Sequence, residues 1–247
     1  MIPEDQNSNQ EILFKYLLEN SNKINKKSVI LLDADRTICE EDTSRILNDL
    51  GNIDLKRIKM GFQKHGYTYD GFYLNAKIYS EMEVKKYKEL SKIVASQTIL
   101  YPGVVDFISD VQRIADVIIV TAGIKEIWKN IIKERKLVDV VLIGGIHDQC
   151  DDFIIGRHEK GIVCDFFKNM GKKVVAFGDS DVDTLMLQKA DKAIVVVNHK
   201  NNWDLIPNLK NHKSLYQISF KDFTHSGLNQ IRFEDIIKEI FVSKVSE

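Results

Sequence analysis

The chain has 247 residues and a net charge of −1, from 35 basic and 36 acidic side chains. This length suits one large domain, or one domain with a lid, and allows a substantial buried core. The balanced charge argues against nucleic acid or an anionic membrane as the main partner, and no apolar run approaches the roughly 20 residues that a membrane span needs.

The cysteines and the first residues bear on the compartment. Cys39, Cys150 and Cys164 are spaced like neither a disulfide framework nor a zinc site. Residues 1–10 are polar and lack the apolar stretch of a secretory signal. We therefore expect a reducing, cytoplasmic environment, whereas the sequence leaves the oligomeric state open.

The first buried strand ends in two aspartates. Apolar side chains at helical spacing predict a helix over 11–18, and the uncharged run 28–32 then predicts a strand buried on both faces, as in a parallel sheet. Asp33 and Asp35 follow it, at the carboxyl end where ligands bind in such sheets. Their carboxylates would repel each other unless a cation such as a hard divalent metal lies between them. The alternative is an aspartate N-cap and turn.

Residues 39–97 differ from the rest of the chain, because they form broken helical stretches without a clear buried strand. About 60 residues is too long for an ordinary loop. We expect a small helical subdomain, a candidate lid over Asp33 and Asp35, inserted into a core domain made of residues 1–38 and 98–247.

Strands and helices alternate after this insertion. The predicted helices cover 104–114, 124–132, 160–170 and 233–241, and the predicted strands cover 117–120, 138–143, 173–177 and 193–197. We expect a small hairpin or flap over 147–158 and a polar tail between the last strand and the last helix. The alternation predicts a three-layer, doubly wound α/β fold with a parallel sheet.

Polar residues gather at the ends of three predicted strands, and a lysine opens a helix nearby. They are Asp33 with Asp35, Thr121, Asp179 with Asp183, and Lys160. Each has a structural alternative: Thr121 could cap the following helix, Lys160 could be solvated, and Asp179 and Asp183 could cap a short helix. If the grouping were accidental, all these structural alternatives would have to hold at once. We therefore favour an active site.

The motifs resemble the four motifs of the haloacid dehalogenase (HAD) superfamily of phosphatases. They are Asp33-Ala34-Asp35-Arg36-Thr37, Thr121, Lys160 and Gly178-Asp179-Ser180-Asp181-Val182-Asp183, in that order over about 150 residues. The position of the insertion, Tyr101-Pro102-Gly103-Val104 and Thr121-Ala122-Gly123 are similar to the phosphoserine phosphatase branch, which carries a helical cap there.

The resemblance implies the chemistry. Asp33 would be the nucleophile that forms an aspartyl-phosphate, and Asp35 the general acid and base. Mg²⁺ would be held by the Asp33 carboxylate, the Asp35 backbone carbonyl and Asp179.

It also implies how the phosphate is held. Thr121 and the backbone N–H groups near Ala122 and Gly123 would bind phosphate oxygens. Lys160 would pair with Asp33 and the transferring phosphoryl group. Asp183 would tether Lys160 or the waters of the metal.

The departures from this branch concern the substrate. Arg36 stands where a serine is usual, and Ser180 and Val182 replace a glycine and an asparagine of the fourth motif.

The substrate-carboxylate arginine of the cap is also replaced. Asn75 aligns with it, with Lys77 close by, while Asp42 or Glu41 could meet a substrate amine. Because a site built to pair a carboxylate discriminates strongly against ligands without one, losing the arginine favours another phosphomonoester than phosphoserine.

The predicted function is a Mg²⁺-dependent, phosphoserine phosphatase-like hydrolase of a small phosphorylated metabolite. The alternatives are a phosphotransferase, a phosphatase acting on a sugar phosphate or nucleoside monophosphate, and, less favoured, a non-catalytic phosphate- or partner-binding module. Four tyrosines of the insertion could line a pocket for a sugar or base, although we favour packing within the insertion. They are Tyr67, Tyr69, Tyr73 and Tyr79.

Overall fold

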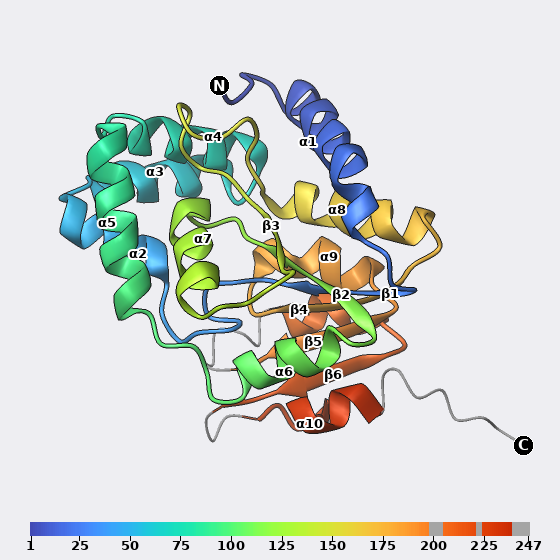
Figure 1. Ribbon diagram of the computed structural model, residues 1–247. Coiled ribbons are helices and arrows are strands. Elements are labelled where there is room, and N and C mark those ends of the chain that lie inside the picture. The colour runs from blue at the N-terminus through green and yellow to red at the C-terminus, as the bar shows by residue number, and fades with distance from the viewer. Residues whose placement is uncertain (198–204, 221–223, 239–247) are drawn as a thin grey trace, which may run out of the picture.

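A seven-stranded sheet forms the centre of the protein. The computed structural model describes residues 1–197, 205–220 and 224–238. All strands are parallel, in the order β3-β2-β1-β4-β5-β6-β7 (Figure 1). They are β1 (Ser28–Leu32), β2 (Ala115–Val120), β3 (Val141–Ile143), β4 (Lys173–Gly178), β5 (Lys192–Val196), β6 (Leu215–Ile218) and β7 (Asn229–Gln230). The predicted α/β fold is confirmed.

Strand β1 lies between β2 and β4. Its last residue, Leu32, pairs with Ile119 of β2 and Phe177 of β4. All five residues of β1 are buried, because alternate side chains enter the two cores on opposite faces of the sheet. The carboxyl ends of β1, β2 and β4 therefore meet at one edge.

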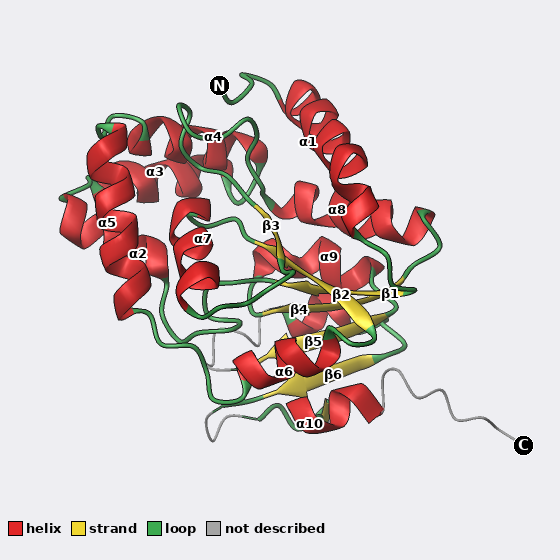
Figure 2. Cartoon of the chain, in the orientation of Figure 1, coloured by secondary structure: helices red, strands yellow, loops and turns green. Residues whose placement is uncertain are grey.

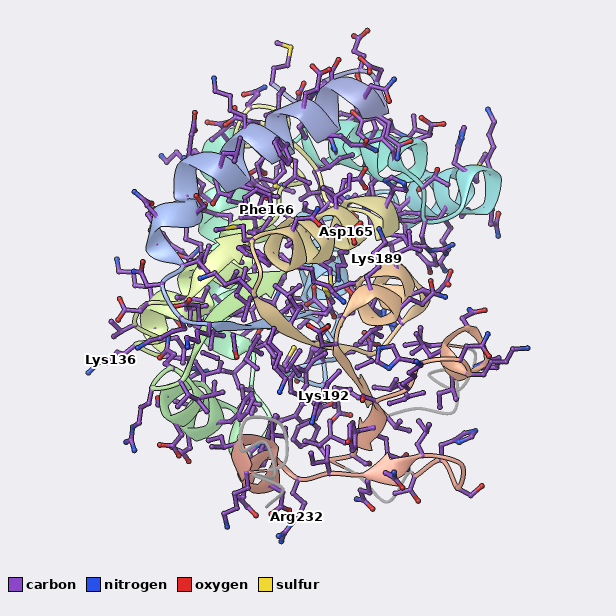
Figure 3. All side chains as sticks on the ribbon, turned by 90° about the vertical axis from the view of Figure 1, so that its right-hand side faces the viewer. Lys136, Asp165, Phe166, Lys189, Lys192 and Arg232 are labelled. Carbon is purple, nitrogen blue, oxygen red and sulfur yellow. The ribbon has the colours of Figure 1, made fainter. Side chains whose placement is uncertain are left out.

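Helices cover both faces of the sheet (Figure 2). One face carries α1 (Gln6–Asn20), α8 (Arg157–Asn169) and α9 (Thr184–Lys189), and the other carries α6 (Val104–Val111), α7 (Lys125–Glu134) and α10 (Phe233–Ile236). Phe14 of α1 packs edge-on against Phe166 of α8, and Asp165 of α8 pairs with Lys189 of α9 (Figure 3). None of the helices that the structure describes combines the length and apolar character needed to cross a bilayer.

Four helices follow β1 and form the helical insertion: α2 (Thr43–Gly51), α3 (Leu55–His65), α4 (Tyr69–Tyr79) and α5 (Val84–Gln97). They stand together to one side of the sheet (Figure 1). Asp42 and Asp54 cap α2 and α3 by accepting hydrogen bonds from backbone N–H groups of the first turn. An antiparallel bridge between Cys39 and Leu100 joins the two ends of the segment.

Of the hairpin or flap predicted over 147–158, the hairpin is wrong. Residues 147–156 contain no strand, and α8 begins at Arg157. The buried backbone of Ile154 bonds instead to the Asn9 side chain, which donates to its carbonyl at 3.1 Å and accepts from its N–H at 2.9 Å. A side chain of α1 thus replaces the partner strand.

The prediction of a polar tail after residue 197 is also wrong, because it contains β6 and β7. Strand β6 places the polar Gln217 in a buried position, where its amide bonds to the carbonyls of His225 and Leu228. A buried polar residue weakens the apolar pattern that reveals a strand. Ile240 and Phe241 of the predicted last helix lie outside the described residues.

Candidate active site

Asp33 lies at the carboxyl end of β1 and is only 6% exposed. Its N–H donates to the Phe177 carbonyl at 3.0 Å, which continues the pairing of β1 with β4. The carboxylate accepts from Lys160 Nζ at Oδ1 and from Thr37 Oγ1 at Oδ2, the latter at 2.8 Å. Asp33 is therefore held in one orientation by two donors.

Lys160 is buried in the first turn of α8, so its interpretation as a solvated lysine is wrong. Its ammonium bridges Asp33 Oδ1 and Asp183 Oδ1, the latter at 2.6 Å. Burial alone would lower the pKa of Lys160, but the charges of Asp183 and Asp33 raise it above the usual value. The side chain is a fixed cation between two carboxylates.

Asp183 holds the loop after β4 as well as Lys160. Its Oδ2 accepts from the backbone N–H groups of Asp179 and Ser180, both at 3.1 Å. A Cβ at residue 178 would lie 2.5 Å from the Asp183 Cβ, so only glycine allows this approach. The capping interpretation of Asp183 and its predicted tether to Lys160 are thus compatible.

Three buried carboxylates converge at this point. Asp33, Asp179 and Asp183 each place one oxygen within 4.8 Å of the other two. Burial, followed by the charge of Asp183, raises the pKa of Asp33 to about 6, and burial with the charges of Asp33 and Asp183 raises that of Asp179. Because Asp33 and Asp179 line the cavity and Asp183 does not, Asp33 and Asp179 are the carboxylates that fit a hard cation such as Mg²⁺.

Asp35 faces the insertion. Its Oδ1 accepts from the N–H of Thr43, at the start of α2, at 2.8 Å, and its Oδ2 lies 3.4 Å from the indole nitrogen of Trp128. Burial, and then the charge of Asp42, raise the pKa of Asp35 to about 7. A carboxyl group with this pKa can give up and regain a proton near neutral pH.

Thr121 follows β2, and its Oγ1 accepts from the N–H of Gly123 at 2.9 Å. It does not cap α7, whose N-cap is Ile124. The Thr121 hydroxyl proton can still be donated to an anion. The N–H of Gly123, by contrast, is turned toward Thr121, and a Cβ at this position would overlap Asp35 Oδ2.

The predicted site residues surround one cavity of about 540 Å³. Those that line it are Asp33, Asp35, Asp42, Asn75, Thr121, Ala122, Gly123, Lys160 and Asp179. Asp183 lies behind Lys160. Glu41 and Lys77 are not among the lining residues, and Lys77 pairs with Asp148 at 2.9 Å.

Several side chains that line the cavity were not predicted from the sequence. The cations Arg45 and Lys59 and the rings of Phe62 and Phe72 all line the cavity. Helical spacing can show that Lys59 and Phe62 share a face of α3. Helical spacing cannot show that this face lines the same cavity as Asp33.

The four tyrosines divide between the two interpretations. Tyr67 and Tyr79 line the cavity. Tyr69 and Tyr73 do not, and their rings stack on each other with centroids 5.9 Å apart.

Arg36 also lines the cavity, has a left-handed backbone with φ of 60°, and pairs with Asp42 at 2.5 Å.

The doubly wound parallel sheet, with helices inserted after β1 and an aspartate cluster at the strand ends, is a HAD-like fold. A phospho-aspartyl intermediate analogue of phosphoserine phosphatase superposes with a TM-score of 0.58 and 16% identity, over 87% of this chain and 99% of that chain. A phosphoserine phosphohydrolase-like protein from Francisella tularensis superposes with a TM-score of 0.53 and 19% identity, over 76% of this chain and 94% of that chain. A HAD-family hydrolase from Salmonella enterica serovar Typhi superposes with a TM-score of 0.56 and 13% identity, over 87% of this chain and 79% of that chain.

No protein-family model matches the sequence, and no curated protein matches it. The structural likeness nevertheless extends over nearly the whole of the phosphoserine phosphatase chain. The predicted resemblance to the HAD superfamily and its phosphoserine phosphatase branch is confirmed for the fold.

Proposed function

We propose that the protein is a Mg²⁺-dependent phosphohydrolase that acts on a small phosphorylated metabolite through an aspartyl-phosphate on Asp33. The observation that carries this proposal is the Asp33 carboxylate, held by Lys160 and Thr37 on the cavity surface with Asp35 two residues away. The superposition with a phospho-aspartyl form of phosphoserine phosphatase supports it. Neither nucleic acid nor a membrane is part of the proposed function.

The two aspartates have different surroundings that suit different roles. Burial raises the pKa of Asp33, but the Lys160 ammonium bound to its carboxylate favours the ionised form, so Asp33 can act as the nucleophile. Asp35 accepts from the N–H of Thr43, and burial with the charge of Asp42 raises its pKa, so Asp35 can hold a proton and act as the general acid. Separate environments for two nearby carboxyl groups are a common basis for such a division of roles.

The proposed reaction has two steps. Asp33 attacks phosphorus in line, the ester P–O bond breaks, and Asp35 gives its proton to the departing alcohol oxygen. Asp35 then takes a proton from water, which attacks the same phosphorus, releases inorganic phosphate and regenerates the Asp33 carboxylate. Lys160 and the Thr121 hydroxyl stabilise the negative charge on the phosphoryl oxygens.

Mg²⁺ would be held by Asp33, Asp179 and the Asp35 backbone carbonyl. When bound, it offsets the repulsion between the anionic phosphate and the buried carboxylates. The helical insertion would close over the substrate and exclude bulk water from the aspartyl-phosphate.

The test is phosphate release from phosphoserine, sugar phosphates and nucleoside monophosphates, with Mg²⁺ or with excess chelator. We expect Mg²⁺-dependent release that Asp33→Asn lowers by at least about 10³-fold, because the amide cannot form the aspartyl-phosphate. Asp106→Asn, an exposed substitution on α6, is the matched control and should keep full activity.

Three outcomes would contradict the proposal: no release from any substrate, equal release with chelator, or an active Asp33→Asn variant. Acceptor alcohols are added in a parallel assay. Transfer of phosphate to an alcohol in preference to water would identify a phosphotransferase instead.

A further inference from the structure

Asn75 of α4 carries a buried acceptor that no group in the described part of the chain satisfies. The residue is 8% exposed and lines the cavity. Its Oδ1 is buried and, among the described residues, has no hydrogen-bond partner. A buried polar atom left unpaired is unfavourable, so a donor arriving with a ligand would remove this cost.

Two other pairs of polar side chains in the cavity lining bind each other. Tyr79 Oη donates to Asn48 Oδ1 at 2.7 Å, and Asp42 binds Arg36. Within the described part of the chain, Asn75 Oδ1 is the one lining side-chain atom that is both buried and unpaired. It therefore marks where a hydrogen-bond donor of the substrate is expected.

Three aromatic rings line the same cavity. Phe62 of α3, Tyr67 between α3 and α4, and Phe72 of α4 have ring centroids 5.2 to 6.3 Å apart. We call these three residues the aromatic wall. Such a surface favours a flat or ring-shaped ligand, and the cavity of about 540 Å³ falls in the ~300–1,000 Å³ range of pockets that hold drug-sized ligands.

We propose that the substrate is a phosphomonoester whose alcohol part is a ring bearing hydroxyl or amino groups. The ring packs on the aromatic wall, and one of its donors bonds to Asn75 Oδ1 while the phosphate meets Asp33. This inference rests on the proposed phosphohydrolase function. Nucleoside monophosphates and cyclic sugar phosphates share this chemistry, whereas acyclic phosphoserine would leave the aromatic wall uncovered.

The experiment compares kcat/KM for nucleoside 5′-monophosphates, hexose phosphates, phosphoserine and p-nitrophenyl phosphate. The last compound carries a ring without a donor, so it reports the phosphohydrolase chemistry without a hydrogen bond to Asn75 Oδ1. In the wild type we expect one of the two ring classes to exceed phosphoserine by at least about 10-fold. The preferred class identifies the source of the ring.

Two substitutions test the acceptor. Asn75→Leu should lower kcat/KM for the preferred ring substrate by about 10- to 100-fold, with p-nitrophenyl phosphate changed by no more than about 2-fold. Asn75→Asp keeps an acceptor oxygen, so it should retain the preference for that ring substrate over p-nitrophenyl phosphate. Loss of the preference in Asn75→Asp would overturn the assignment of Asn75 as an acceptor.

The aromatic wall is tested with a matched tyrosine pair. Tyr67→Ala should lower kcat/KM for ring substrates by about 10-fold and leave phosphoserine unaffected. Tyr73→Ala should change neither, because Tyr73 stacks on Tyr69 and does not line the cavity.

The failure of this inference and of the phosphohydrolase proposal give different results. If p-nitrophenyl phosphate is hydrolysed but phosphoserine is preferred, or if Asn75→Leu lowers all substrates equally, only the substrate class is overturned. If none of the compounds is hydrolysed, both are.

Discussion

Lys160 balances the charge of the buried carboxylates at the end of β1. It is 1% exposed and binds both Asp33 and Asp183. Removing one partner of a buried ion pair costs about 3–5 kcal/mol, since the remaining charge is left uncompensated. Lys160 therefore stabilises the fold as well as the site, and its substitution would not separate the two roles.

A substitution at Gly123 can separate an effect on activity from an effect on stability, because the lack of a side chain at this position leaves room for Asp35. We expect Gly123→Ala to lower kcat by about 10- to 100-fold, since the added Cβ overlaps Asp35 Oδ2 and moves Asp35, the proposed proton donor. Steady-state kinetics measure this loss, and thermal unfolding should show a nearly unchanged Tm. Gly61→Ala, where a Cβ meets nothing closer than 3.9 Å, is the control. Full activity of Gly123→Ala would contradict this role of Asp35.

At the scale of elements, the loop after β3 joins the helical insertion to the core. Asp148 accepts from the N–H of Ile2 at 2.7 Å and from Lys77 of α4 at 2.9 Å, and its own N–H donates to Ser80 Oγ at 2.8 Å. Tyr69 of α4 donates to the carbonyl of Pro3. The loop, the N-terminal segment and α4 are thus held together mainly through one carboxylate.

We expect Asp148→Ala to lower the free energy of unfolding by about 1–3 kcal/mol at pH 7, because it leaves these donors unpaired. Burial by itself would raise the pKa of Asp148. Hydrogen bonds from Lys77 and Ile2 outweigh burial, so the pKa lies below its usual value. The stabilisation is therefore complete above the unfolded pKa of about 3.9 and is lost as pH falls through the lower folded pKa.

Urea unfolding of both proteins at pH 7 and at about pH 3 measures this effect. The difference in free energy of unfolding between wild type and Asp148→Ala should be smaller at the lower pH. Asp152→Ala in the same loop, where Asp152 is exposed, should match the wild type throughout. A difference that is independent of pH would argue against the Asp148 carboxylate as the cause.

At the scale of the whole molecule, the sheet separates two hydrophobic cores and also separates the cysteines. Cys39 lies in the core that contacts the insertion, and Cys164 lies in the core under α1 and α8. All three cysteines are free. Burial raises the pKa of Cys164 to about 12 and that of Cys39 further, so neither is a ready nucleophile.

We therefore expect one thiol, Cys150, to react with a disulfide reagent in the native protein, and all three to react after unfolding. Cys150 is partly exposed, although burial raises its pKa as well, so its reaction should be slow. Thiol titration with and without denaturant measures how many thiols react in the unfolded and the native protein. Cys150→Ser should remove the reaction of the native protein. Native reaction of Cys39 or Cys164 would show that the cores open readily.

The sequence by itself determined the sheet and the polar side chains at its carboxyl edge. The apolar run of β1 predicts a buried strand, and parallel strands bring their carboxyl ends to one edge, so Asp33, Asp35, Thr121 and Asp179 could be placed together. Lys160 is harder to place from the sequence, because no strand end brings it to that edge. Its position at a helix start is equally typical of a solvated lysine.

The tertiary structure alone decided how the insertion meets the core. Nothing local shows that Asn9 replaces a partner strand for Ile154, that Tyr67 lines the cavity while Tyr73 does not, or that Asn75 Oδ1 is left unpaired. Local periodicity reports which side chains share a face of a helix. What that face contacts depends on elements far away in the chain, and substrate recognition is built from such contacts.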